Sequence, residues 1–222
     1  MGIIGDSLSS GYTVPEGGPA EVNTHYDLAW WQVLKRDSGA EYKYFARGGL
    51  TTRSWLSDAE GYAKASQDAN KCCAYVVALG VNDQYDLGMD YLGTAADINL
   101  ADPTQNADTF YGNYGKIIQL MTALVPKAKF FAVTIPREGG NNAAYNEAIR
   151  AIAEMFDNCY LVDLAADYMP IFRGGFLYDH EFSAHYSAAG YQYIGKIMEK
   201  AIGDTIAANA VDFRYIQFAL DE

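Results

Sequence analysis

The sequence predicts an α/β fold, with a five-stranded parallel sheet covered by helices on both faces. Short apolar runs typical of buried strands alternate with longer segments whose apolar residues recur at the helical period. The chain has 222 residues, 50% of them hydrophobic, and a chain of this size can bury about 70% of its unfolded surface. We therefore expect one domain over residues 1–222, with its parallel strands joined by right-handed crossovers.

Five apolar runs predict the strands. The first begins almost at Met1 and ends just before Ser7. The run from Lys129 to Ile135 is rich in aromatic and β-branched residues and is ended by Pro136. The remaining predicted strands cover residues 41–45, 74–79 and 160–164.

Apolar residues at helical spacing predict the helices between these strands. A short helix is expected around residues 28–34, and a clear apolar stripe over residues 110–125 is closed by Pro126. Residues 145–156 repeat the helical period. Ser187 is a favoured capping residue, so we expect it to begin a last long helix.

Two regions lie outside this alternation. Residues 84–108 are rich in Gly, Asp, Asn and Thr and are too long for an ordinary connection, so we expect them to form a wall of a binding cleft. The tail, residues 211–222, is apolar enough to dock on the domain or on a second subunit. Its pattern matches neither a strand nor a helix, so its packing and the oligomeric state stay open.

Charge and cysteine usage narrow the class of protein. The chain has 28 acidic and 16 basic residues, a net charge of −12 that repels phosphate backbones, so no nucleic-acid partner is expected. No apolar stretch approaches the roughly 18 residues of a membrane span, and no signal peptide is visible. We expect a cytoplasmic protein, or a secreted one if a leader or an upstream module is missing. Cys72, Cys73 and Cys159 lack disulfide or metal spacing and are interpreted as buried, reduced thiols.

Four short motifs lie just past a predicted strand or at the start of a helix. They are Gly-Asp-Ser-Leu at 5–8, Phe-Ala-Arg-Gly-Gly-Leu-Thr at 45–51, Gly-Val-Asn-Asp at 80–83 and His-Tyr-Ser-Ala-Ala-Gly-Tyr at 185–191. Singly, each is explained as well by a turn or a helix cap. In this order they resemble the four sequence blocks of the SGNH hydrolases, also called GDSL esterases and lipases. The resemblance implies a flavodoxin-like three-layer α/β/α arrangement with strand order 2-1-3-4-5.

The resemblance assigns roles that ester hydrolysis requires. A serine nucleophile needs a base within hydrogen-bond reach and donors for the oxyanion that develops on the carbonyl. By resemblance, Ser7 is the nucleophile and His185 is the base. The oxyanion hole is formed by the N–H groups of Ser7 and Gly49 and by the side-chain amide of Asn82. Gly48 is a near alternative to Gly49, because a glycine lets substrate approach the backbone closely.

Other polar residues near these motifs have structural interpretations. Asp6 and Asp83 are expected to hold their two loops, because an acid beside the nucleophile would not orient His185. Among the three histidines, His185 is preferred over His180 because a glycine and a tyrosine follow it at the family's spacing. His25 lies in a polar loop without a partner motif.

The sequence departs from the family where the acid that orients the histidine is expected. The family usually places an aspartate three residues before its histidine, and that position is Phe182 here. Asp179 and Glu181 are near in sequence, and a main-chain carbonyl could also accept the Nδ1–H of His185. We favour a Ser–His dyad with such a carbonyl and keep Asp179 as the possible orienting acid. The Gly-x-Ser-x-Gly motif of ordinary α/β-hydrolases is also missing.

The predicted function is that of a serine esterase that removes a short acyl group, most plausibly acetyl, from a carbohydrate or a similar small ester. No metal and no cofactor are expected. The alternative is a glycan-binding module of a cell-surface or phage-type assembly that retains the fold with little turnover, which the missing aspartate favours. A nucleotide or flavin protein is disfavoured, because no Gly-x-Gly-x-x-Gly motif follows the first strand.

Overall fold

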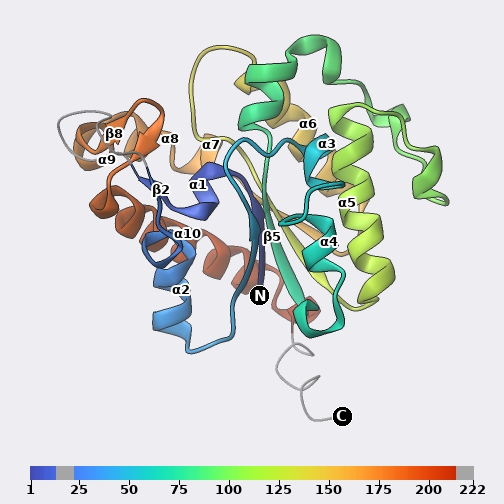
Figure 1. Ribbon diagram of the computed structural model, residues 1–222, viewed down its shortest axis with the longest axis horizontal. Helices are drawn as coiled ribbons and strands as arrows, with labels where there is room; N and C mark the ends of the chain where they lie inside the picture. The colour runs from blue at the N-terminus through green and yellow to red at the C-terminus, as the bar shows by residue number, and fades with distance from the viewer. Residues whose placement is uncertain (14–22, 214–222) are drawn as a thin grey trace.

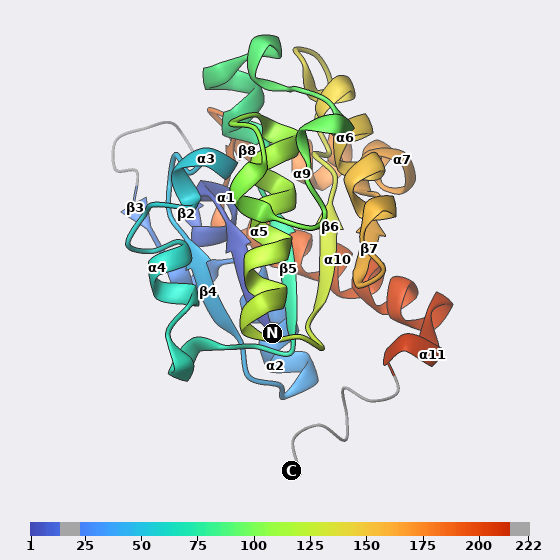
Figure 2. The same cartoon turned by 90° about the vertical axis from the view of Figure 1, so that its right-hand side faces the viewer.

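A computed structural model describes residues 1–13 and 23–213 of the chain. Its centre is a five-stranded parallel sheet in the order β4-β1-β5-β6-β7, which Figures 1 and 2 show from two sides. In chain order this is 2-1-3-4-5, so the predicted fold class and strand order are confirmed. The strands are β4 (Lys43–Ala46), β1 (Gly2–Gly5), β5 (Ala74–Ala78), β6 (Lys129–Val133) and β7 (Cys159–Val162).

Helices cover both faces of this sheet. α2 (Trp31–Ser38) and α10 (Ala188–Ala208) pack against each other on one face. α5 (Phe110–Leu124) and α6 (Asn142–Met155) lie on the other face, together with the short helices α3 (Thr52–Trp55) and α4 (Tyr62–Ala65). Figure 1 looks along the layers, with α10 and α2 on the left of β5 and α5 on the right. The sheet is therefore the middle layer of three.

The alternation of side chains along each strand explains why there are two cores. Ile4, Val77 and Phe130 belong to the core under α5 and α6. Their chain neighbours Ile3 and Val76 belong to the core under α2 and α10. Successive side chains of a strand point to opposite faces of the sheet, so strands that are covered on both faces are apolar at every position.

The long helices begin and end where the capping residues indicate. Thr109 Oγ1 accepts the N–H of Gly112 at the start of α5, which ends at Leu124, two residues before Pro126. Ser187 Oγ accepts the N–H of Gly190 at the start of α10, as the sequence predicts. Such caps satisfy backbone donors that have no partner within the helix.

A second, small sheet is absent from the sequence-based prediction. Its strand order is β3-β2-β9-β8, and each strand has only two residues. Strands this short carry no detectable alternation, which is why periodicity does not find them. The pairing brings β9 beside β2, the strand that directly follows the first helix. The strands are β2 (Tyr12–Thr13), β3 (Asn23–Thr24), β8 (Glu181–Phe182) and β9 (His185–Tyr186).

The connections contain more helical turns than expected. Residues 84–108 form a π-helical turn, η3 (Asp83–Leu87), and the 3₁₀ turns η4 (Met89–Tyr91), η5 (Ala95–Asp97) and η6 (Pro103–Gln105). Tyr91 and Ile98 anchor this segment in the core beneath α5. Three further short helices follow β7, namely α7 (Leu164–Asp167), α8 (Met169–Arg173) and α9 (Gly175–Asp179).

The last described helix packs on the central sheet, and the three cysteines are free. α11 (Ala210–Phe213) docks through Phe213, whose ring stacks on Phe131 with centroids 5.5 Å apart, while residues 214–222 of the predicted tail lie outside the described part of the chain. The three free cysteines are Cys72 and Cys159, which are buried, and Cys73, which is half-buried rather than buried as predicted. Within the described residues, the longest helices are too short or too polar to cross a bilayer.

Candidate active site

Ser7 lies at the carboxyl edge of the central sheet. β1 ends at Gly5, Asp6 caps the next turn by accepting the N–H of Leu8 at 2.9 Å, and Ser7 is the first residue of α1 (Ser7–Ser10). β1 is the strand from which the chain order runs in opposite directions to β4 and to β5. Ligands of open α/β sheets bind at such a switch point, outside the carboxyl ends of the strands.

His185 lies beside Ser7 although the two residues are 178 positions apart in sequence. Its Nε2 atom is 2.9 Å from Ser7 Oγ. Its Nδ1 atom is 3.0 Å from the main-chain oxygen of Ser183. The strand β9, which begins at His185, reaches this place because it pairs with β2, just beyond α1. The ring therefore has a hydroxyl on one nitrogen and a carbonyl acceptor on the other.

A tight hairpin places the carbonyl of Ser183. Phe182, which occupies the position of the family's aspartate, is paired with His185 across the hairpin of β8 and β9. Ser183 and Ala184 form the two-residue turn, and both have positive φ values, 49° and 64°. Asp179 is exposed at the end of α9. It is joined to His185 by no hydrogen bond or ion pair in the described structure.

The loops after β4 and β5 meet beside Ser7. A Cβ atom on Gly48 would lie 3.8 Å from Ser7 Cβ, while Gly49 is exposed and has a φ of 78°, a conformation that favours glycine. Asn82 Nδ2 donates to the main-chain oxygen of Leu50 at 3.0 Å and lies 3.4 Å from Asp6 Oδ2. The three loops predicted to form the site therefore converge.

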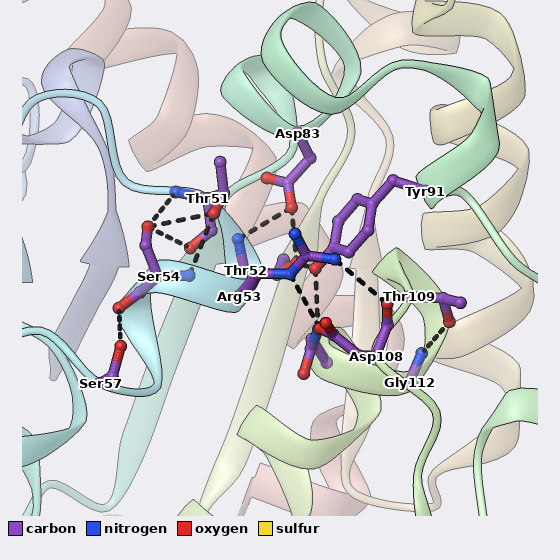
Figure 3. Close-up of polar contacts among 11 residues, drawn as sticks. Thr51, Thr52, Arg53, Ser54, Ser57, Asp83, Tyr91, Asp108, Thr109 and Gly112 are labelled. Carbon is purple, nitrogen blue, oxygen red and sulfur yellow. Dashed lines mark hydrogen bonds and ion pairs between the residues drawn. The ribbon is translucent and has the colours of Figure 1, made fainter.

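A network that extends from the buried Asp83 to an exposed ion pair fixes these two loops relative to each other. Figure 3 shows Asp83 accepting hydrogen bonds from the N–H of Thr52 at 2.9 Å and from its hydroxyl at 2.5 Å. The hydroxyl of Thr52 is also 3.1 Å from the hydroxyl of Tyr91, whose ring lies under the guanidinium of Arg53 at 4.5 Å. Arg53 in turn pairs with Asp108 at 2.9 Å. Asp83 thus holds the loop of Gly49 against the loop of Asn82, in agreement with its predicted structural role.

Burial shifts the protonation of the groups around Ser7. Asp6 is 1% exposed, and desolvation raises its pKa to about 7, although Arg137 acts in the opposite direction. Desolvation likewise raises the pKa of Asp83 to about 6. Burial lowers the pKa of His185, the hydrogen bond to Ser183 opposes this shift, and Arg137 adds to it. His185 is therefore neutral at neutral pH, the state in which Nε2 can accept a proton.

An apolar cavity of about 70 Å³ adjoins this site. Among the residues that line it are Leu8, the neighbour of Ser7, and Val81, the neighbour of Asn82. The ends of β5 and β6 contribute Leu79 and Ile135, and the side opposite the sheet is formed by Phe172 and residues of α10. Such a lining suits an apolar group.

The other predicted histidines lie elsewhere. His180 Nδ1 is 3.0 Å from Ser187 Oγ, so this histidine supports the cap of α10. His25 is exposed and precedes the 3₁₀ turn η1 (Tyr26–Leu28). No cluster of three potential metal ligands occurs within residues 1–13 and 23–213.

Sequence reasoning expected a main-chain carbonyl beside His185 but could not say which residue supplies it, and it missed the guanidinium of Arg137. A carbonyl carries no residue-type signal, so only the geometry of the hairpin assigns it to Ser183. Arg137 did have a signal, because it follows the predicted strand 129–135 at the same edge as the four motifs. Its side chain is 18% exposed and donates to the main-chain oxygen of Ala184.

The comparisons with known proteins agree with the fold. The GDSL-like Lipase/Acylhydrolase family matches residues 3–193. A search of curated proteins finds no match. Three similar solved structures share the fold at low identity.

The first of these is a carbohydrate esterase family 2 enzyme with a carbohydrate-binding domain from Corynascus thermopiles (Myceliophthora fergusii), with TM-score 0.64, 18% identity and coverage of 93% of this chain and 66% of that one. A psychrotrophic esterase from Pseudoalteromonas sp. has TM-score 0.59, 16% identity and coverage of 93% and 96%. A GDSL-like lipase from Bacteroides ovatus has TM-score 0.64, 16% identity and coverage of 92% and 97%. With the family matched over most of its length, the chain belongs to the GDSL-like lipase/acylhydrolase family.

Proposed function

We propose that the protein is a serine esterase that hydrolyses short-chain acyl esters, with acetylated carbohydrates as the favoured substrate class. The observation that carries the proposal is the contact of 2.9 Å between Ser7 Oγ and His185 Nε2, at the carboxyl edge of the sheet. A hydroxyl that is hydrogen-bonded to a neutral imidazole is the arrangement that activates a serine for attack on a carbonyl.

In the first half-reaction, Ser7 Oγ attacks the ester carbonyl while its proton passes to His185 Nε2. The tetrahedral intermediate collapses when His185 returns that proton to the leaving alcohol, and an acyl group remains on Ser7. In the second half, water attacks the acyl group and gives a proton to His185. That proton returns to Ser7 as the carboxylic acid leaves, so the enzyme is restored.

The oxyanion of both intermediates is bound by the N–H groups of Ser7 and Gly49 and by the amide of Asn82. Asn82 already donates to Leu50 at 3.0 Å, and its distance of 3.4 Å to Asp6 is long for a hydrogen bond. The second N–H of the amide can therefore turn to the oxyanion at little cost. Gly48 remains the alternative to Gly49 as the backbone donor.

The carbonyl of Ser183 is proposed to orient His185 in place of an acid. At 3.0 Å it accepts the Nδ1–H, which leaves Nε2 free to accept the proton of Ser7. A neutral carbonyl stabilises the imidazolium less than a carboxylate does. The proposed machinery is therefore a Ser–His dyad, and Asp179 is left without a catalytic role.

The acyl group is assigned to the apolar cavity beside Leu8. A cavity of about 150 Å³ holds a benzene ring, so a volume of about 70 Å³ holds an acyl chain of about two to four carbons. The net charge of −12 disfavours anionic esters. A carbohydrate esterase among the similar structures supports a sugar as the alcohol.

The second candidate is a glycan-binding module with little turnover. One observation favours it: the ring of His185 is held by a carbonyl and has no carboxylate partner in the described structure. A similar structure, with TM-score 0.64 and 14% identity, is described as a carbohydrate esterase whose active site has catalytic and non-catalytic binding functions. The two candidates differ in whether a covalent acyl group forms on Ser7.

The deciding experiment compares Ser7→Ala and His185→Ala with His25→Ala, which removes an exposed histidine side chain that forms no hydrogen bond with Ser7 or His185. Hydrolysis of p-nitrophenyl esters of increasing chain length and of acetylated sugars is measured, and circular dichroism checks the fold. Ser7→Ala should lose about six orders of magnitude in turnover, while His25→Ala should match the wild type. A folded Ser7→Ala protein with most of the activity would exclude Ser7. Glycan binding without hydrolysis by the wild type would establish the second candidate.

A further inference from the structure

Arg137 links the central sheet to the hairpin that carries His185. It follows β6 by four residues, and its side chain is 18% exposed. One guanidinium nitrogen donates to the main-chain oxygen of Ala184 and lies 3.4 Å from Glu181 Oε1. These two partners lie on opposite sides of Ser183, the residue whose carbonyl faces His185. The guanidinium therefore bridges the two arms of the turn.

The hairpin needs such an external bond, because its own geometry is unfavourable. A two-residue turn with positive φ at both positions prefers Asn-Gly or Gly-Gly, whereas Ser183 and Ala184 both carry a Cβ atom. Each such residue costs about 1–2 kcal/mol relative to the right-handed conformation. Strained backbone persists only where its surroundings enforce it. β8 and β9 pair over only two residues each, and the N–H of Ser187 donates one further bond to the main-chain oxygen of His180 at 2.9 Å. Arg137 adds a side-chain restraint at the turn itself.

From these contacts we infer that Arg137 is a positioning residue, which holds the β8–β9 hairpin so that the carbonyl of Ser183 meets His185 Nδ1 and His185 Nε2 meets Ser7. The inference rests on the proposed role of the Ser7–His185 pair. Glu181 assists by fixing the guanidinium through the ion pair. Arg137 thus orients His185 through the backbone of the hairpin, whereas the family usually has an aspartate for this purpose.

The charge of Arg137 and its geometry have opposite effects on turnover. A cation near His185 disfavours the imidazolium, so loss of the charge alone would make His185 a stronger base and would not reduce turnover. Loss of the hydrogen bond to Ala184 would release the turn, and a displacement of about 1 Å can cost about 100-fold in rate. The ring of Tyr12 on β2 lies beside that of His185, with centroids 4.6 Å apart. Two carboxyl groups interact with Arg137 itself, namely Glu181 of β8 through the ion pair and Asp6 ahead of α1 through its charge.

The test compares Arg137→Gln, Arg137→Lys and the control Arg173→Gln. Arg173 lies on α8 and pairs with Glu138 at 2.8 Å, so its removal deletes a nearby surface ion pair that does not touch the hairpin. Ester hydrolysis is measured on the alkaline plateau of the pH profile, where His185 is neutral in every variant. The pH titration of the His185 ring is followed by NMR, with His185→Gln used for assignment.

Arg137→Gln should lower kcat about 100-fold, leave KM within about threefold, and shift the NMR signals of the His185 ring, because the ring loses its bond to the carbonyl of Ser183. Arg137→Lys keeps the charge but not the planar guanidinium, so it should also lower kcat and shift these signals. Arg173→Gln should change none of these quantities. Glu181→Gln leaves the bond to Ala184 intact and should cost less than about tenfold in kcat, which provides a milder variant if Arg137→Gln does not fold.

A folded Arg137→Gln protein with kcat within twofold of the wild type would overturn the inference. So would NMR signals of the His185 ring that are unchanged in that variant. If the wild type hydrolyses no ester, the proposed function fails and the NMR spectra alone decide the role of Arg137. In that case an Arg137→Gln spectrum in which the signals of the His185 ring match those of the wild type refutes the positioning role.

Discussion

A Gly→Ala substitution should have opposite effects on the stability of the protein at two positions of the same helix. α10 contains Gly195, which is buried, and Gly203, which is exposed. By helix propensity alone, either Gly→Ala change stabilises the protein by about 1 kcal/mol. At Gly203 nothing lies within 4 Å of the added Cβ atom, so the gain should be realised in full.

At Gly195 the surroundings reverse the sign. The new Cβ atom would lie 2.4 Å from Val33 Cγ2 and 2.6 Å from the main-chain oxygen of Trp30, at the contact between α10 and α2. The side chain of Val33 can rotate, but a carbonyl of the neighbouring backbone cannot move without shifting the chain. Overpacking of this kind costs about 1–3 kcal/mol. The upper end of this range applies, and after the propensity gain we expect a net loss of about 1–2 kcal/mol.

Urea unfolding followed by circular dichroism measures both variants against the wild type. Thermal unfolding should give a Tm about 2–4 °C higher for Gly203→Ala and about 2–8 °C lower for Gly195→Ala. Ester hydrolysis at 25 °C should be unchanged by Gly203→Ala, which lies far along α10 from Ser187. A Gly195→Ala protein as stable as Gly203→Ala would refute the close packing of α10 on α2.

Three further outcomes are expected. Asn82→Ala should lower kcat by about 100- to 1,000-fold with little change in KM, because the amide of Asn82 binds charge that is present mainly in the transition state. A raised KM with constant kcat in steady-state assays would instead make Asn82 a substrate-binding residue. Asp6 has a folded-state pKa of about 7 against a usual 3.8, so the folded protein binds the extra proton, and the free energy of unfolding should fall as the pH rises from about 4 to 7. When this free energy is measured by urea unfolding at several pH values, Asp6→Asn should flatten its decrease over that range. An unaltered decrease would argue against a protonated Asp6. Acyl chains of about two to four carbons should be hydrolysed faster than long chains, and the reverse order in a p-nitrophenyl series would place the acyl group outside the cavity beside Leu8.

Local patterns in the sequence were sufficient to predict the layers of the fold. Strand and helix periods reflect which side chains face the two cores, so the runs at 74–79 and 129–135 became β5 and β6, and the stripe at 110–125 became α5. The caps of α5 and α10 are also local, because a Ser or Thr oxygen and its N–H partner lie three residues apart. Short helices such as α7 and α9 were not predicted, because a single turn has too few residues to show a period.

The sequence by itself determined the fold class and, through the family resemblance, the strand order. It also identified the four motifs that the fold brings together near Ser7. Only the tertiary structure decided what holds His185. The contact with Ser7 spans 178 positions and depends on the pairing of β9 with β2, whose strands of two residues leave no pattern in the sequence. The carbonyl of Ser183 and the guanidinium of Arg137 likewise meet the hairpin through backbone atoms. Backbone atoms are the same in every residue, so residue identity cannot reveal such contacts, whereas the folded chain brings them together.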